Sequence, residues 1–90
     1  MSLEIGALVT SVCGRDNGTV LAVIGSTSEC VILADGRKRR LDKPKSKKVK
    51  HVRPLGYKLS EVTLQQLTEG IITNKMLYRD IKRILMSETV

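Results

Sequence analysis

The fold is decided by the stretch ALVTSVCGRDNGTVLAVI, residues 7–24, in which two apolar, β-branched runs flank a short polar segment. The first run stops at Gly14 and the second stops before Gly25. Asn17-Gly18 between them is the dipeptide that best supplies the positive φ values of a tight hairpin turn. We therefore predict two antiparallel strands joined by a short loop.

Further strand-forming segments follow, about ten residues apart and separated by glycine turns. Asp35-Gly36 is expected to turn the third strand into the fourth, so that the fourth carries cations on both faces. Pro44 cannot donate a ladder hydrogen bond, so residues 42–46 are expected to form a loop or an edge segment. Five short strands predict a small β-barrel or sandwich. They are expected at residues 7–13, 19–24, 29–34, 37–41 and 48–53.

After residue 56 the pattern changes to that of two short helices. Ser60 or Thr63 can cap the first helix, with Thr63 and Gln66 as a capping box, and Gly70 can end it. Thr73 or Asn74 can cap the second. Helices this short are marginal alone, so we expect them to pack on each other or on the barrel.

The second helix is predicted to have an apolar stripe at positions i, i+4, i+7 and i+8, formed by Leu77, Ile81, Ile84 and Leu85. Basic residues occupy the opposite side, and Asp80 lies at pairing distance from Arg83. They are Arg79, Lys82 and Arg83. The chain is thus expected to be mainly β with α, with a barrel at residues 1–56 and a helical extension at 57–90.

Positive charge is concentrated in residues 37–53, which we call the basic segment. It holds ten basic side chains and one acidic side chain, a formal charge of +9, while the rest of the chain has six basic and eight acidic groups, or −2. A patch this dense attracts polyanions, of which phosphate backbones are the commonest. A solvated loop or a patch for anionic lipid are the alternatives. Lipid binding usually needs a second anchor, and none is visible beside the segment.

Other function classes find little support in the sequence. His51 is the sole histidine, the acids are scattered, and no glycine-rich loop opens a helix, so we expect neither an enzyme nor a bound cofactor. Cys13 and Cys30 lack the spacing of a zinc or redox motif, and no metal is expected. No apolar run approaches a membrane span and the start of the chain lacks signal-peptide features, so a cytoplasmic protein with reduced thiols and no membrane contact is expected.

The residues Gly6-Ala7-Leu8-Val9, followed by Gly14-Arg15-Asp16-Asn17-Gly18-Thr19-Val20, resemble the KOW motif, a strand, a glycine-containing loop and a second strand. The Gly-Arg-Asp-x-Gly form is similar to a family that contains a eukaryotic and archaeal large-subunit ribosomal protein and small bacterial RNA-binding proteins. The likeness continues through Lys43-Pro44-Lys45, Lys50-His51 and the segment 72–84. It implies an SH3-like barrel that binds RNA, usually ribosomal RNA, or associates with the ribosome or translation.

The KOW loop and the basic segment are therefore the candidate RNA-contacting regions. Gly18 can also be a turn residue that needs positive φ, and Arg15 can equally pair with Asp16 or a carbonyl. Phosphate contact is favoured over base stacking because the only aromatic residues, Tyr57 and Tyr78, are expected to lie outside the strand region. The candidates are Arg15, Asn17, Gly18, Arg37, Lys38, Arg39, Arg40, Lys43, Lys45, Lys47, Lys48, Lys50, His51 and Arg53.

An alternative is a protein-interaction module that docks a translation or transcription factor. Its sequence support is the helix expected at residues 74–86, whose mixed apolar and basic surface could serve a partner. In both cases we expect a monomer when free. Charge alone does not distinguish RNA from DNA.

Overall fold

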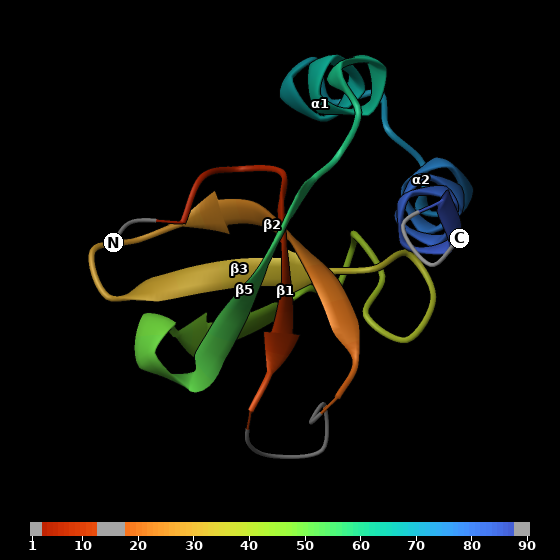
Figure 1. Cartoon of the computed structure of the whole chain (residues 1–90). Coiled ribbons are helices and arrows are strands. Elements are labelled where there is room, and N and C mark those ends of the chain that lie inside the picture. The colour runs from red at the N-terminus through yellow and green to blue at the C-terminus, as the bar shows by residue number, and fades with distance from the viewer. Residues whose placement is uncertain (1–2, 13–17, 88–90) are drawn as a thin grey trace.

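The computed structural model describes residues 3–12 and 18–87 of the 90-residue chain. The predicted class, mainly β with two C-terminal helices, is confirmed (Figure 1). In chain order the elements are β1 (Ala7–Ser11), β2 (Val20–Ser26), β3 (Cys30–Ala34), β4 (Lys45–Lys48), the 3₁₀ helix η1 (Val49–His51), β5 (Val52–Lys58), α1 (Glu61–Thr68) and α2 (Asn74–Ser87).

The five strands form one antiparallel sheet in the order β4-β3-β2-β1-β5. The predicted β1–β2 hairpin is confirmed, with Leu8 opposite Ala22 and Val9 opposite Leu21. Successive side chains of a strand point to opposite faces. Because all four of these residues are buried, both faces of the hairpin must be covered.

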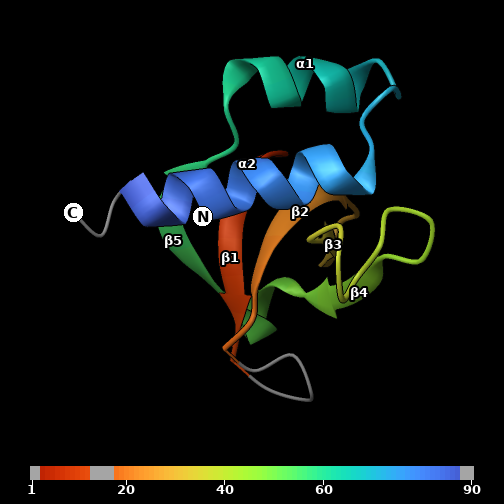
Figure 2. The ribbon, with the colours of Figure 1, turned by 90° about the vertical axis from the view of Figure 1, so that its right-hand side faces the viewer.

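Two apolar clusters, one on each face of the sheet, provide this cover. The first joins sheet residues to the C-terminal segment, and it consists of Leu8, Ala22, Ala34, Leu59, Leu77 and Ile81. The second comes from the strands alone, and it consists of Val9, Leu21, Val23, Val31, Leu33 and Val52. One face of the sheet is therefore covered by helix, as Figure 2 shows for α2. The sheet curls so that side chains of its other face pack on one another and form the second cluster.

The chain connection between β4 and β5 explains why the sheet curls. These strands are the two outermost in the sheet, yet only η1 separates them in the chain. Four strand spacings of a flat sheet would put them about 19 Å apart, whereas the four residue steps from Lys48 to Val52 reach at most about 14 Å. Within residues 3–12 and 18–87 no ladder joins β4 to β5, so the curled sheet is open at this seam.

Two of the predicted strands are wrong. Residues 37–41, expected to be a strand, form a loop, and β4 begins only at Lys45, inside the stretch expected to be a loop or edge. The buried carboxylate of Asp35 causes the first error. Its Oδ1 accepts hydrogen bonds from the backbone N–H groups of Arg37 and Arg39, both at 2.9 Å, which removes them from any ladder. The predicted strand at residues 48–53 is the end of β4, η1 and the start of β5.

The helices end and begin at residues named in the sequence analysis. Ser60 is the N-cap of α1, because its hydroxyl accepts from the Thr63 backbone N–H, so the capping box starting at Thr63 is wrong. Gly70 follows the C-terminus with φ +75°, as expected for a helix stop. Thr73 caps α2 by accepting from the Met76 N–H at 3.2 Å. The apolar stripe of α2 faces the first cluster, as predicted.

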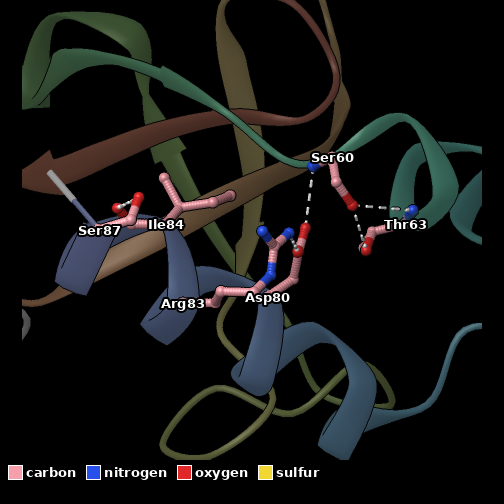
Figure 3. Close-up of polar contacts among 6 residues, drawn as sticks. All are labelled: Ser60, Thr63, Asp80, Arg83, Ile84 and Ser87. Carbon is pink, nitrogen blue, oxygen red and sulfur yellow. Dashed lines mark hydrogen bonds and ion pairs between the residues drawn. The ribbon is translucent and has the colours of Figure 1, made fainter.

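A buried carboxylate in α2 fastens the two helices at one point (Figure 3). Asp80 is 6% exposed, accepts a hydrogen bond from the Ser60 backbone N–H at 2.9 Å, and forms the predicted ion pair with Arg83. Burial raises the pKa of Asp80, but hydrogen bonds from Ser60, Arg83 and Thr63 outweigh this effect and hold the pKa below its ordinary value. The start of α1 is thus held to the middle of α2.

Candidate nucleic-acid interface

The β1–β2 loop that carries the KOW resemblance is described in part. Gly18 is exposed, has φ +85°, and donates its backbone N–H to the Ser11 carbonyl at 3.1 Å. Its expected role as a turn residue that needs positive φ is confirmed. The other two candidates of this loop, Arg15 and Asn17, lie outside the described residues, and contact with RNA stays a prediction for all three.

The first half of the basic segment is a loop with a rigid frame. Besides the two hydrogen bonds to the Asp35 carboxylate, the Arg39 carbonyl accepts from the N–H groups of Asp35 and Gly36, at 2.9 and 3.1 Å. The Arg39 side chain is half-buried. Four other cations of this loop are exposed, and we call them the loop cluster: Arg37, Lys38, Arg40 and Lys43.

The first half-turn of α2 holds this loop in place. The Leu41 N–H donates to Asn74 Oδ1 at 2.7 Å. Gly36 has φ +83° and lies so close to α2 that a Cβ atom built on it would be 2.1 Å from the Asn74 carbonyl oxygen. Only glycine fits there without moving the helix or the loop. Figure 2 shows the loop beside the N-terminal half of α2.

A tyrosine completes the contact between loop and helix. Arg37 Nη1 donates to the Tyr78 hydroxyl at 2.7 Å, and the Arg37 guanidinium carbon lies over the ring, 5.3 Å from its centroid. Lys82 Nζ also lies over the ring, at 5.8 Å. The hydrogen bond from Arg37 lowers the pKa of Tyr78, and the charges of Arg37 and Lys82 lower it further against the opposing effect of burial.

The second half of the basic segment follows the edge strand away from α2. In β4, Lys45 and Lys47 are half-buried and lie opposite Leu33 and Val31, on the face that folds onto itself. Lys48 is exposed. From Lys45 to Lys48 the strand advances about 10 Å, which separates the loop cluster from the cations beyond it.

A turn built on η1 presents the remaining cations. The Val49 N–H donates to the Glu29 carbonyl, and the His51 carbonyl accepts from the Val12 N–H, both at 3.0 Å, so that η1 bridges the β2–β3 turn and the base of the β1–β2 loop. His51 is half-buried. The exposed cations here are called the turn cluster: Lys48, Lys50 and Arg53.

An open hollow of about 640 Å³ lies beside the turn cluster. Hydroxyl-bearing residues of the β2–β3 turn and two lysines of the turn line it, including Ser26, Thr27, Ser28, Lys48 and Lys50. Donors of both kinds can hydrogen-bond an anionic oxygen. The hollow and the turn cluster can therefore bind the same kind of ligand, an anionic oxygen.

The RNA contacts predicted from the sequence leave out three cations that the structure brings next to the loop cluster. Lys75, Arg79 and Lys82 are exposed on α2, and Lys82 shares the Tyr78 ring with Arg37. Their spacing of i, i+4 and i+7 puts them on one helix face, a signal that the sequence carries. That the loop lies against this helix could not be read from spacing.

Comparison with known proteins found no match for this chain. No protein-family model matches the chain, and no curated protein is significantly similar to it.

Of the helices in the described part, none has the length and apolarity that crossing a membrane requires. Residues 3–12 and 18–87 contain no group of three or more His, Cys, Asp or Glu side chains placed to hold a metal ion.

Proposed function

We propose that the chain binds structured RNA, with ribosomal RNA as the favoured target. The contacts are made to phosphates by the basic segment and by the KOW loop, residues 15–18. The observation that carries the proposal is the exposure of seven of the ten cations of this segment, the members of the loop and turn clusters. The one acid of the segment, Asp42, lies 3.5 Å from Arg40. Exposed cations in excess of acids are the electrostatic footprint of phosphate binding.

Contact with phosphates is better supported than stacking of bases. The chain has no Phe or Trp. The expectation that Tyr57 lies outside the strands is wrong, because Tyr57 is in β5, but it packs against the first apolar cluster. Tyr78 has two cations over its ring. Proteins that read single-stranded RNA by stacking need open aromatic faces. Arginine and lysine, by contrast, bind phosphate oxygens directly.

The proposal includes the finer features that the KOW resemblance implies. These are an SH3-like barrel, a KOW loop in which Arg15, Asn17 and Gly18 contact RNA, and a cytoplasmic, non-catalytic monomer that associates with the ribosome or translation. The β1–β2 hairpin and the curl of the sheet are the structural support for the barrel. Two edges that are close in the chain are what a small barrel needs for closure.

Crosslinking in cells, followed by sequencing of the attached RNA, tests the proposal. Reads at one ribosomal locus are expected, whereas reads that do not exceed an untagged control would contradict it. In a filter-binding titration, six to eight phosphate contacts give a slope of log K against log salt of roughly −4 to −7, and a slope flatter than about −2 would exclude this mode. A DNA duplex of the same sequence measures how much of the affinity belongs to RNA itself.

A protein-docking function keeps one observation in its favour. The apolar stripe of α2 packs on the sheet, but Val62 and Ile71, in and just after α1, are 66% and 60% exposed. Copurification with and without RNase separates the two functions. Partners lost on RNase treatment favour RNA binding, and partners that persist and are lost on Val62→Ser with Ile71→Ser favour docking.

A further inference from the structure

We infer that the outer face of α2 binds the same RNA as the loop cluster, so that loop and helix form one phosphate-binding surface. The inference rests on the proposed RNA-binding function and assigns it a second element, in the part of the chain outside the basic segment. The surface, called the loop–helix surface, consists of the loop cluster with Lys75, Arg79 and Lys82.

The two sides of α2 differ completely in chemistry. The apolar residues lie against the sheet, and Leu77 and Ile81 are buried there. The sole acid of α2, Asp80, is also buried and is bonded to Ser60 and Arg83. The outward face therefore presents positive charge without an acid, and its three cations extend over about 10 Å of the helix axis.

The loop and the helix are fixed to each other before any RNA arrives. The Leu41–Asn74 hydrogen bond, the close approach of Gly36 to Asn74, and the Arg37–Tyr78 hydrogen bond all cross the boundary between them. Each of these contacts joins the basic segment, or Gly36 directly before it, to the first half of α2. Groups that are already in place lose less conformational freedom on binding, so a preformed set of cations binds phosphates more tightly than a flexible set.

At the Tyr78 ring, the loop and the helix each contribute one cation. The ring holds one cation from the loop, Arg37, and one from the helix, Lys82, within 6 Å of its centroid. Attraction between each cation and the ring offsets part of the repulsion between two like charges. A phosphate that contacts both side chains would remove the rest of that repulsion, and this favours an anion at this point.

A lipid surface fits the same charges less well. Membrane-binding helices combine a basic face with an apolar face that enters the bilayer. The apolar face of α2 is already in the core, and of its large apolar side chains only Met86 is exposed, at 64%. The surface offers charge without an anchor, as a phosphate polymer requires.

The test compares two variants that change the net charge equally. Lys75→Gln/Arg79→Gln/Lys82→Gln removes three cations from the loop–helix surface. Val62→Glu/Gln65→Glu/Ile71→Glu adds three acids at exposed positions in and just after α1. Binding of a labelled RNA hairpin with a stem of about 16 base pairs, the span of a small double-stranded RNA-binding domain, is measured as a function of salt concentration for both variants and the wild type.

We expect the α2 variant to bind about ten- to a hundredfold more weakly near about 0.1 M salt and its slope to be flatter by roughly two to three. The α1 variant should lose less than about threefold and keep the slope, because it removes no phosphate contact. Equal losses in the two variants, or an unchanged α2 variant beside a wild type that binds with a steep slope, would overturn this inference alone. A wild type whose slope is flatter than about −2 would instead overturn the proposed function.

Folding is checked by the thermal transition of each variant. The three α2 side chains are exposed, so little change is expected. If the triple variant unfolds, Arg79→Gln alone replaces it, with an expected flattening of the slope by about one. Anionic phospholipid vesicles serve as a second ligand, and vesicle binding that exceeds hairpin binding would also contradict the inference.

Discussion

The loop cluster and the turn cluster come from one 17-residue segment, yet the molecule supports them differently. A buried carboxylate, Asp35, and a helix residue, Asn74, hold the loop cluster. The turn cluster is held by two backbone hydrogen bonds of η1 and by the strand pairing of Lys48 with Cys30 and of Arg53 with Thr10, next to an open hollow. A run of charge in a sequence therefore does not define a surface. The elements to which it is fastened decide how its cations are presented.

Gly36→Ala is expected to have the largest effect, because it disturbs the contact between the loop cluster and α2. The new side chain would combine an unfavourable positive φ with a Cβ atom 2.1 Å from the Asn74 carbonyl oxygen, and we expect a loss of about 3 kcal/mol in the free energy of unfolding. Gly18→Ala is the matched control in the other region, because φ is also positive there but no atom lies within 4 Å of the Cβ position. It should cost about 1 kcal/mol. Urea unfolding measures both, and equal losses would show that the loop is not seated on α2.

Asp80→Asn tests how much the Asp80 carboxylate stabilises the position of α2, which supports the loop cluster. It replaces a charged acceptor of hydrogen bonds from Ser60 and Arg83, and we expect a loss of about 2 kcal/mol near neutral pH. The pKa of Asp80 is lower in the folded state than in the unfolded state. Its contribution is therefore fully present above the unfolded pKa and is lost as pH falls through the folded pKa.

The difference in stability between the wild type and Asp80→Asn should accordingly shrink below about pH 4. Urea unfolding at a series of acidic pH values measures it. A difference that stays constant down to the lowest pH would mean that the carboxylate charge contributes nothing.

Removal of each cluster in turn compares their contributions to RNA affinity. Lys38→Gln/Arg40→Gln/Lys43→Gln should weaken binding of the RNA hairpin about tenfold, and Lys48→Gln/Lys50→Gln/Arg53→Gln about threefold, because the loop cluster lies beside the cations of α2 and one RNA can contact both sets. The two variants remove the same charge, so each serves as the control for the other. Affinities in the reverse order would place the main phosphate contacts at the turn.

The smallest expected effect concerns Tyr78 and is seen at alkaline pH. In a Tyr57→Phe background, Arg37→Ala should raise the pKa of Tyr78, because it removes the hydrogen bond that lowers this pKa. The phenolate absorbance of Tyr78 measures the change. A pKa lowered by folding stabilises the protein only as pH rises through the folded pKa, so unfolding at neutral pH should not register this ionisation. An unchanged titration would mean that Arg37 and Tyr78 do not interact in solution.

Much of the fold could be predicted because it depends on local signals. Apolar, β-branched runs bounded by turn residues located β1, β2 and β3, and the stripe of Leu77 and Ile81 located the buried side of α2. The errors occur where a side chain replaces a backbone partner. The Asp35 carboxylate accepts hydrogen bonds from two N–H groups that a strand at residues 37–41 would need. These hydrogen bonds decide whether the Asp-Gly pair closes a hairpin or a longer loop.

The candidate site was predictable in composition but not in arrangement. Charge counting found the ten cations of the basic segment, and exposure of the loop and turn clusters agrees with a surface role. The pairing of Arg37 with Tyr78 joins residues 41 positions apart, and no periodicity encodes it. The division of the domain at residue 56 falls inside β5, and the first apolar cluster contains residues from both sides of it.

The lysines of β4 have a consequence for self-association. β4 is an outermost strand of an open sheet, and such an edge can pair with the same edge of another copy. Lys45, Lys47 and Lys48 occupy three of its four positions, and Pro44 stands immediately before it, which are the residues that proteins use to block such pairing. The positive charge of β4 therefore disfavours edge-to-edge aggregation. Replacing these lysines with neutral β-formers would remove this protection and, at Lys48, one cation of the turn cluster.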